Sequence, residues 1–426
     1  MKPEGALLMF TPEVILLTIL VFFVLVGIHE WGHFYFAKRA GILVREFAIG
    51  FGPKVFSYKK GETRYTLRLL PLGGYVRMAG EDPEIIQVNP GQTIGIALHH
   101  GTVTHLYLDQ LDRRRDVTIG EVETIDLEHQ LSLKLSVDNE THIYPVHPQS
   151  MMITRGKETQ IAPFDRQFGG KSVTKRAISI FAGPLMNFIL AFALFLSYIW
   201  LSGIPEHIKL AKIEADSPAL AAGLQEGDLV LAVDGIEIGA ESGRLVELIA
   251  ASAGKEMIWT IRRDGEDKLI KVTPAKTEGA GKVGIHIDLY ARSASAMEVI
   301  SGASTMMIDF TKAIFTGFKQ LVLLQFKLDD LGGPVRIVEV TGQAASLGLD
   351  KLIWWAAILS LYLGIFNLLP FPALDGSRLL FLGIEAIRGK PVDPTRESMV
   401  HFVGFAMLMM LMIAVTYNDI LRLFKG

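Results

Sequence analysis

The sequence predicts an α-helical integral membrane protein with four transmembrane helices. Half of its 426 residues are hydrophobic, and they concentrate in stretches that are long and nearly free of charge. A helix needs about 20 such residues to cross a bilayer. Four stretches meet this requirement: residues 14–36, 177–204, 352–374 and 399–418. This concentration of apolar residues, more than the overall composition, places the chain in the membrane class.

Charge and cysteine content exclude several classes of function. The formal net charge is −3, and the sequence has neither a zinc-finger nor a phosphate-loop spacing, so nothing indicates nucleic acid as a partner. The chain has no cysteine, which excludes disulfides, thiol nucleophiles and thiolate metal sites. Any metal must therefore be bound by histidine and carboxylate side chains.

The distribution of basic residues predicts the orientation. The first apolar stretch is long, ends in His and Glu and lacks the A-x-A exit of a signal peptide, so we expect it to be retained as a helix. Basic residues cluster after the first stretch, before the second, and between the third and fourth: Lys38, Arg39, Arg45; Lys171, Lys175, Arg176; Arg378, Arg388, Lys390, Arg396. The positive-inside rule makes these connections cytoplasmic. Both termini and residues 205–351 then lie outside, as in a multi-pass membrane protein.

The loops have patterns of their own. Residues 47–78 alternate apolar and polar residues around Gly-Pro and Lys-Lys-Gly turns, which predicts a β-hairpin. Residues 81–170 are polar with alternating patches and predict a cytoplasmic β-rich insertion. Residues 291–351 mix apolar and charged residues, as expected for amphipathic helices on the external face.

The first apolar stretch contains the motif H-E-x-x-H, formed by His29, Glu30 and His33. Two histidines four residues apart lie on one face of a helix and can share a metal, and zinc suits neutral imidazoles. Glu30 is then the general base that activates water. The motif specifies only three of its five residues, so it also occurs by chance. An ionisable side chain near mid-bilayer, however, costs at least about 2.5–3.5 kcal/mol, and a bound metal offsets that cost.

A catalytic zinc site normally has three protein ligands and an open position. Asp375, at the end of the third apolar stretch, is the strongest candidate for the third ligand. His401 is the alternative, although a lone histidine near the end of a span is more often interfacial or hydrogen-bonded within the bundle. Pro370 and Pro372 break the helix before Asp375, and such a break is tolerated where it lines a wet cavity. The sequence therefore predicts a water-accessible site at this depth.

These motifs together resemble those of the site-2 protease family, in particular its bacterial sigma-factor-regulating branch with a single PDZ domain. They are H-E-x-x-H in the first stretch, F-A-G-P-L-M-N in the second and N-x-x-P-x-P-x-L-D-G in the third. The resemblance implies a zinc ion (Zn²⁺) bound by His29, His33 and Asp375, with Glu30 activating water. It also implies that Asn367 helps to hold an extended substrate. Residues 47–78 resemble the family's membrane re-entrant β-loop, which pairs with the substrate backbone.

Cleavage inside a membrane imposes needs that other residues can meet. A peptide bond in a transmembrane helix is shielded, so the helix must unwind, and the strand edge of a hairpin can pair with the freed backbone groups. Glycines permit close backbone approach, although paired glycines in turns are more often conformational. Asn187 shapes the cavity or belongs to a small-residue helix interface. The expected substrate-binding residues are Asn367, Pro370, Pro372, Gly73, Gly74 and Asn187.

The segment between the second and third apolar stretches resembles a bacterial PDZ domain. Residues 207–290 contain D-S-P-A, then A-G-L-Q-E-G-D-L-V and V-D-G. PDZ domains bind an extended segment, often a free carboxyl terminus, along a strand edge. We expect this extracytoplasmic domain to filter or dock substrates, and a simple spacer is the alternative.

The expected function is regulated intramembrane proteolysis of a single-pass protein that another protease has already trimmed. An anti-sigma factor is the expected substrate, and signal-peptide remnants are the second candidate. A non-proteolytic PDZ membrane scaffold with a structural metal is the rival, and a transporter is disfavoured because paired helix breaks are missing.

The expected segments are the first transmembrane helix (1–46), hairpin loop (47–80), cytoplasmic insertion (81–170), second helix (171–206), PDZ domain (207–290), amphipathic region (291–351), third segment (352–380), cytoplasmic loop (381–398) and fourth helix with tail (399–426).

Overall fold

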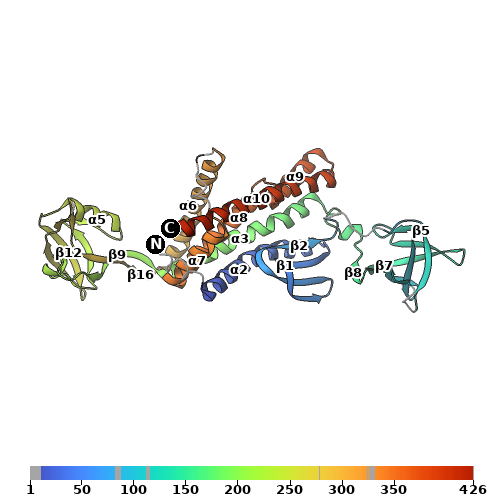
Figure 1. The fold of residues 1–426 in the computed structure, drawn as a ribbon, viewed down its shortest axis with the longest axis horizontal. Helices are drawn as coiled ribbons and strands as arrows, with labels where there is room; N and C mark the ends of the chain where they lie inside the picture. The colour runs from blue at the N-terminus through green and yellow to red at the C-terminus, as the bar shows by residue number, and fades with distance from the viewer. Residues whose placement is uncertain are drawn as a thin grey trace. The chain divides into compact units, whose positions relative to one another are not determined.

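The computed structural model describes residues 11–425 apart from 82–87, 112–115, 278, 324 and 326–331. The chain divides into two compact units, one formed by residues 1–194 and 309–426 and the other by residues 195–308. Figure 1 follows the elements along the chain, from the blue helix α2 to the red helix α10.

Within the described residues, four helices are long and apolar enough to cross a membrane, in agreement with the predicted number. They are α2 (Pro12–Arg39), α3 (Val173–Ser202), α8 (Leu349–Asn367) and α10 (Pro394–Lys425). Large apolar side chains on them face outward, as lipid requires: Leu16 is 66% exposed and Phe402 is 73% exposed. Helix α8 ends at Asn367 rather than at the predicted residue 374, because Pro370 and Pro372 cannot continue its hydrogen bonding.

The hairpin beside α2 consists of two long, bent strands, β1 (Val44–Lys60) and β2 (Thr63–Met78). Because both strands bend, residues 46–49 pair on one side with 64–67 and on the other with 74–77. Residues 74–78 pair only with β1 among the described strands, so they form an edge of this small sheet. The sheet packs on α2 through Phe34 and Phe47, whose rings lie 5.4 Å apart. Figure 1 shows the hairpin lying along α2.

Residues 93–160 form a sheet that closes on itself. Its strands are β3 (Thr93–His99), β4 (Thr102–Tyr107), β5 (Thr118–Asp126), β6 (Ser132–Val137), β7 (Glu140–Thr154) and β8 (Lys157–Gln160). They follow the order β4-β3-β5-β6-β7-β8, and β4 also pairs in parallel with β7. Ile94, Ile96, Leu106, Leu133 and Leu135 fill the interior with no exposed surface.

Polar contacts attach this insertion to the hairpin. Glu62, at the turn between β1 and β2, accepts hydrogen bonds from Arg166 at 2.7 Å and from Gln160 at 2.7 Å. Arg166 closes the short 3₁₀ turn η3 (Phe164–Arg166), and its carbonyl accepts from the backbone N–H of Leu43 at 2.8 Å. The insertion therefore meets the hairpin through buried backbone and a charged pair.

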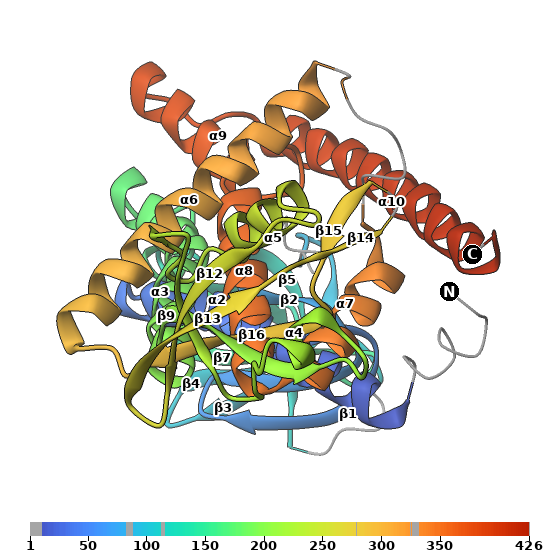
Figure 2. The same ribbon diagram turned by 90° about the vertical axis from the view of Figure 1, so that its left-hand side faces the viewer.

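The unit of residues 195–308 is built on a sheet of order β13-β12-β10-β9-β16, with β11 beside β10. Its elements are β9 (Ile204–Ile213), α4 (Pro218–Ala221), β10 (Leu229–Val233), β11 (Ile236–Glu237), α5 (Ser242–Ala251), β12 (Met257–Arg263), β13 (Glu266–Val272), β14 (Ala275–Thr277), β15 (Ala280–Lys282) and β16 (Ile285–Arg292). Leu245 and Ile249 of α5 pack into a core with Trp259, which has no exposed surface. Figure 2 looks onto this unit and shows α5 against the sheet.

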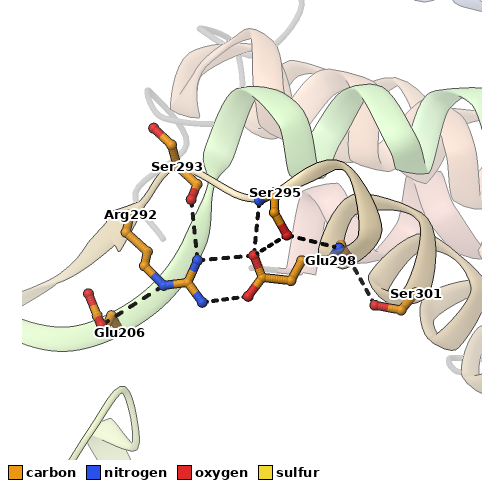
Figure 3. Close-up of polar contacts among 6 residues, drawn as sticks. All are labelled: Glu206, Arg292, Ser293, Ser295, Glu298 and Ser301. Carbon is orange, nitrogen blue, oxygen red and sulfur yellow. Dashed lines mark hydrogen bonds and ion pairs between the residues drawn. The ribbon is translucent and has the colours of Figure 1, made fainter.

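A polar network fixes the start of α6 (Ala296–Val322) in the same unit (Figure 3). Ser295 and Glu298 form a reciprocal cap: the Ser295 backbone N–H donates to the Glu298 carboxylate at 2.9 Å, and the Glu298 N–H donates to Ser295 Oγ at 3.4 Å. Arg292, the last residue of β16, donates to Glu298 at 3.1 Å and lies 3.9 Å from Glu206 in β9. Arg292 thus ties the neighbouring strands β9 and β16 to the first turn of α6.

Two shorter helices complete the described chain. Helix α7 (Pro334–Leu347) packs against α2 and α8. The backbone N–H of Arg336, in the first turn of α7, donates a 3.0 Å hydrogen bond to Asp419 of α10. Helix α9 (Asp375–Arg388) follows the proline-containing break after α8 and ends at Gly389 in the left-handed conformation. Asp375 is thereby presented at the first turn of a new helix.

Candidate metal centre

His29 and His33 lie on one face of α2. Their Nε2 atoms are 3.2 Å apart, and each residue is 6% exposed. The separation of four residues produces this pairing, because side chains at i and i+4 lie one above the other on a helix. Two buried imidazoles therefore point the same nitrogen into the same space.

Asp375 brings a carboxylate to the same point. Its Oδ2 lies 3.2 Å from Nε2 of His29 and 3.2 Å from Nε2 of His33. A tetrahedral zinc ion with bonds of about 2.0–2.1 Å separates its ligands by roughly 3.3 Å, which matches this triangle. Among the described residues, these three are the group of histidine and acidic side chains placed to hold a metal. The donor set of two imidazoles and one carboxylate fits zinc.

Contacts behind the histidines fix their orientation. Nδ1 of His33 donates to the Ser179 carbonyl of α3 at 2.9 Å, which leaves Nε2 free to bind metal. The Asn187 side-chain amide, also from α3, lies 3.1 Å from Nδ1 of His29. Asn187 has no exposed surface and its Oδ1 has no other partner, so a turn of the amide lets Oδ1 accept the Nδ1 proton. Helix α3 thus supports both imidazoles.

Glycines let the neighbouring elements approach this cluster. A Cβ on Gly183 of α3 would lie 2.2 Å from Nε2 of His33, and a Cβ on Gly32 would lie 2.4 Å from the Ala182 carbonyl oxygen. Helices α2 and α3 therefore pack backbone to backbone at the level of the histidines. Either methyl group would push the helices apart at the metal centre.

Glu30 is 7% exposed and lies against the edge of the hairpin sheet. A Cβ on Gly74 would lie 2.7 Å from Glu30 Cγ and 2.7 Å from the Ala48 carbonyl oxygen. Gly74 therefore permits close backbone approach to the candidate base. Gly73 has a different reason to be glycine, since its φ is +150° and a Cβ there would meet the Phe51 ring at 2.5 Å.

The residues expected to contact substrate fall into two groups. Asn367 and Gly74 line a cavity of about 1660 Å³ whose wall also includes His29, Glu30, His33 and Asp375. Asn367 donates to the Leu363 carbonyl of its own helix at 3.0 Å. Gly73, Pro370, Pro372 and Asn187 are not among the described residues that line this cavity. Asn187 has no exposed surface, and its side-chain contact is with His29.

His401, the alternative third ligand, is not part of the cluster formed by His29, His33 and Asp375. It lines the same cavity, but its Nδ1 accepts a 3.0 Å hydrogen bond from the backbone N–H of Ala373, and it is not in the group that can hold a metal. The third position beside the two histidines is therefore occupied by Asp375.

Sequence reasoning missed the contacts that are not visible in motifs. The Ser179 carbonyl acts through its backbone, so no side-chain pattern could identify it. The contact between Asn187 and His29 joins two helices whose packing register the sequence does not specify. The only available signal was the row of small residues around Gly183, which indicates close helix packing.

Comparisons with known proteins agree with this geometry. The profile of peptidase family M50 matches residues 17–411. The zinc metalloprotease RasP of Oceanobacillus iheyensis is 44% identical over 95% of this chain and 98% of that protein. The regulator of sigma-W protease RasP of Bacillus subtilis is 45% identical over 95% of this chain and 98% of that protein. The probable protease eep of Enterococcus faecalis is 37% identical over 97% of this chain and all of that protein.

Proposed function

This chain belongs to peptidase family M50 and is a zinc metalloprotease of the membrane, and from that premise we propose that it cleaves anti-sigma factors within their transmembrane segments. One observation carries the proposal: three metal-binding side chains from two distant parts of the chain meet beside a membrane helix, with a buried glutamate next to them. The name of the Bacillus subtilis relative, a regulator of sigma-W protease, supports the choice of substrate. The substrate has first been trimmed by another protease, and signal-peptide remnants are the second candidate.

In this proposal His29, His33 and Asp375 hold the zinc ion. When bound, zinc acts as a Lewis acid, which polarises a carbonyl and lowers the pKa of water. The Ser179 carbonyl and the Asn187 amide keep the two imidazoles in the tautomer that offers Nε2. The short separations among the three ligand atoms support this assignment.

Glu30 is the general base. Its carboxylate accepts a proton from the attacking water and then donates it to the amine of the leaving peptide. Burial against Gly74 keeps the carboxylate at one place and limits competing solvent. Positioned proton transfer of this kind contributes about 10²–10⁴-fold to rate.

The substrate strand adds to the edge formed by residues 74–78. This edge lines the cavity beside Glu30, and among the described strands its backbone pairs with β1 alone, on the opposite side. An unwound transmembrane helix needs partners for its freed N–H and C=O groups, and β-addition provides them. Asn367, at the end of α8, holds the extended segment from the other wall of the cavity. The hairpin acts as a membrane re-entrant loop.

The unit of residues 195–308 acts as an extracytoplasmic PDZ domain that receives the trimmed end of the substrate. Strand β16 pairs only with β9 among the described strands, so its other edge is open. Leu289 of β16 is 46% exposed and Val246 of α5 is 55% exposed, which provides apolar surface for a peptide. The basic residues in the loops between the helices support an extracytoplasmic location for this unit in the bacterial cytoplasmic membrane.

The test compares the purified full chain with its Glu30→Gln variant on a model transmembrane substrate derived from an anti-sigma factor. We expect both proteins to bind zinc and only the wild type to cleave, with at least about a 100-fold loss for the variant. Equal cleavage by both would refute Glu30 as the base. Zinc binding without cleavage by either protein would favour the alternative of a membrane scaffold with a structural metal.

A further inference from the structure

The segment between α8 and α9 adopts an unusual backbone conformation just before Asp375. Ala373 has a φ of +75°, in the left-handed region that residues with a Cβ rarely adopt. Its backbone N–H donates to Nδ1 of His401 in α10 at 3.0 Å. A residue held in this strained conformation normally has neighbours that enforce it. Since Ala373 lies two residues before Asp375, its conformation sets the direction in which the carboxylate enters the site.

Helix α10 is shaped to receive this segment. A Cβ on Gly404 would lie 2.1 Å from Cβ of Pro372 and 2.7 Å from the Pro372 carbonyl oxygen, so the glycine lets the helix approach the backbone of the break. His401 and Gly404 are three residues apart and therefore lie on the same face of α10. One face of the helix thus offers both a gap for Pro372 and an acceptor for Ala373.

The surroundings of His401 fix its ring. Because Nδ1 accepts from a backbone N–H, the proton of the neutral ring is on Nε2. Nε2 faces the Glu397 carboxylate one turn earlier in α10, at 3.7 Å. On the other side, the ring meets Phe381 of α9 edge-on, with 5.8 Å between centroids. The imidazole is therefore oriented by groups on α9 and on α10 itself.

We propose that His401 is a positioning residue that places the metal ligand Asp375 by holding Ala373 in its left-handed conformation. The inference rests on the proposed function only in taking Asp375 as a zinc ligand. His401 contacts neither the metal-binding atoms nor Glu30, so its effect reaches the site through the backbone of residues 373–375. Losing the acceptor releases the segment and weakens zinc binding without removing any ligand.

Three substitutions of His401 test whether its Nδ1 acts as a hydrogen-bond acceptor or whether the side chain only fills space. In His401→Asn the amide oxygen takes the place of Nδ1, in His401→Gln an amide takes the place of Nε2, and His401→Leu has no acceptor. The readout is the zinc dissociation constant of the full chain in detergent, measured by competition with a chelator. We expect about a tenfold loss of zinc affinity for the Leu and Gln variants and near wild-type affinity for Asn.

A second variant keeps the inference falsifiable if His401→Leu is unstable. Glycine adopts a φ of +75° without strain, so adding Ala373→Gly to His401→Leu should recover part of the lost zinc affinity. An Asn variant as weak as Leu, or a Leu variant as tight as wild type, would overturn the proposal. Failure of the proposed function is seen separately, as cleavage that survives Glu30→Gln.

Discussion

The orientation of His29 depends on the Asn187 amide. This side chain reaches Nδ1 of His29 from a fully buried position in α3. An imidazole that binds metal through Nε2 keeps its proton on Nδ1 and needs an acceptor there. Asn187→Leu should therefore weaken zinc binding by about 10–100-fold.

Asn187→Asp is the matched control, because it has a similar size and keeps an oxygen acceptor. Its zinc affinity should stay closer to wild type than that of the Leu variant when both are measured by chelator competition. If the Leu variant bound zinc as tightly as wild type, Asn187 would only fill space between the helices.

For single residues, the sequence predicted which side chains group together as candidate ligands, but not the contacts that hold these side chains in place. The spacing of His29 and His33 already places both on one helix face, whatever the rest of the fold does. Asp375 could be identified because ionisable groups are rare near membrane depth. The contact of His401 with the Ala373 N–H could not be predicted, since it depends on a left-handed residue whose conformation only the packing of α10 enforces.

Among the elements, apolar stretches predicted all four membrane helices, because length and hydropathy act locally. The end of α8 was placed too late, since its apolar composition continues through Leu374 although the prolines have already broken the helix. The double pairing of β1 was also beyond sequence reasoning. Alternation predicts a strand, but it does not say that the strand bends and pairs twice with its partner.

The attachment of the insertion to the hairpin should depend on pH. Hydrogen bonds from Arg166 lower the pKa of Glu62 from its ordinary 4.5 to about 2. A carboxylate with a lowered pKa stabilises the fold above its ordinary pKa, and this contribution disappears as the pH falls from 4.5 towards 2. The contact of Glu62 with Arg166 and Gln160 should therefore loosen in this window. The loss is modest, because Glu62 is partly solvated.

Hydrogen exchange at the backbone N–H groups of Leu43 and Phe168 reports on this attachment, since both bond across it. After correction for intrinsic exchange rates, protection should fall below pH 4.5 in the wild type. Glu62→Gln should show the same modest decrease in protection already at neutral pH, with little further change on acidification. Identical pH profiles for the two proteins would show that another group controls the attachment.

For the whole molecule, the metal centre joins parts of the chain that are far apart in sequence. His29 and His33 belong to the first membrane helix, and Asp375 begins the helix after the third. One ligand atom from each of the three lies within 4.8 Å of the other two. Asp375 Oδ2 is buried and lies 3.2 Å from Nε2 of each imidazole. Assembly of the bundle therefore brings polar groups together at membrane depth, where an unpaired charge is costly.

Zinc should consequently stabilise the bundle as a whole. A ligand that binds only the folded state adds RT ln(1 + [L]/Kd), or about 2.7 kcal/mol when its free concentration is 100 times Kd. Chelation should lower the melting temperature of the detergent-solubilised protein, and added zinc should restore it. His33→Ala removes one ligand, so its melting temperature should hardly respond to zinc. If wild type and variant responded alike, the stabilising ion would be bound elsewhere, and the three side chains would be neighbours without a shared metal.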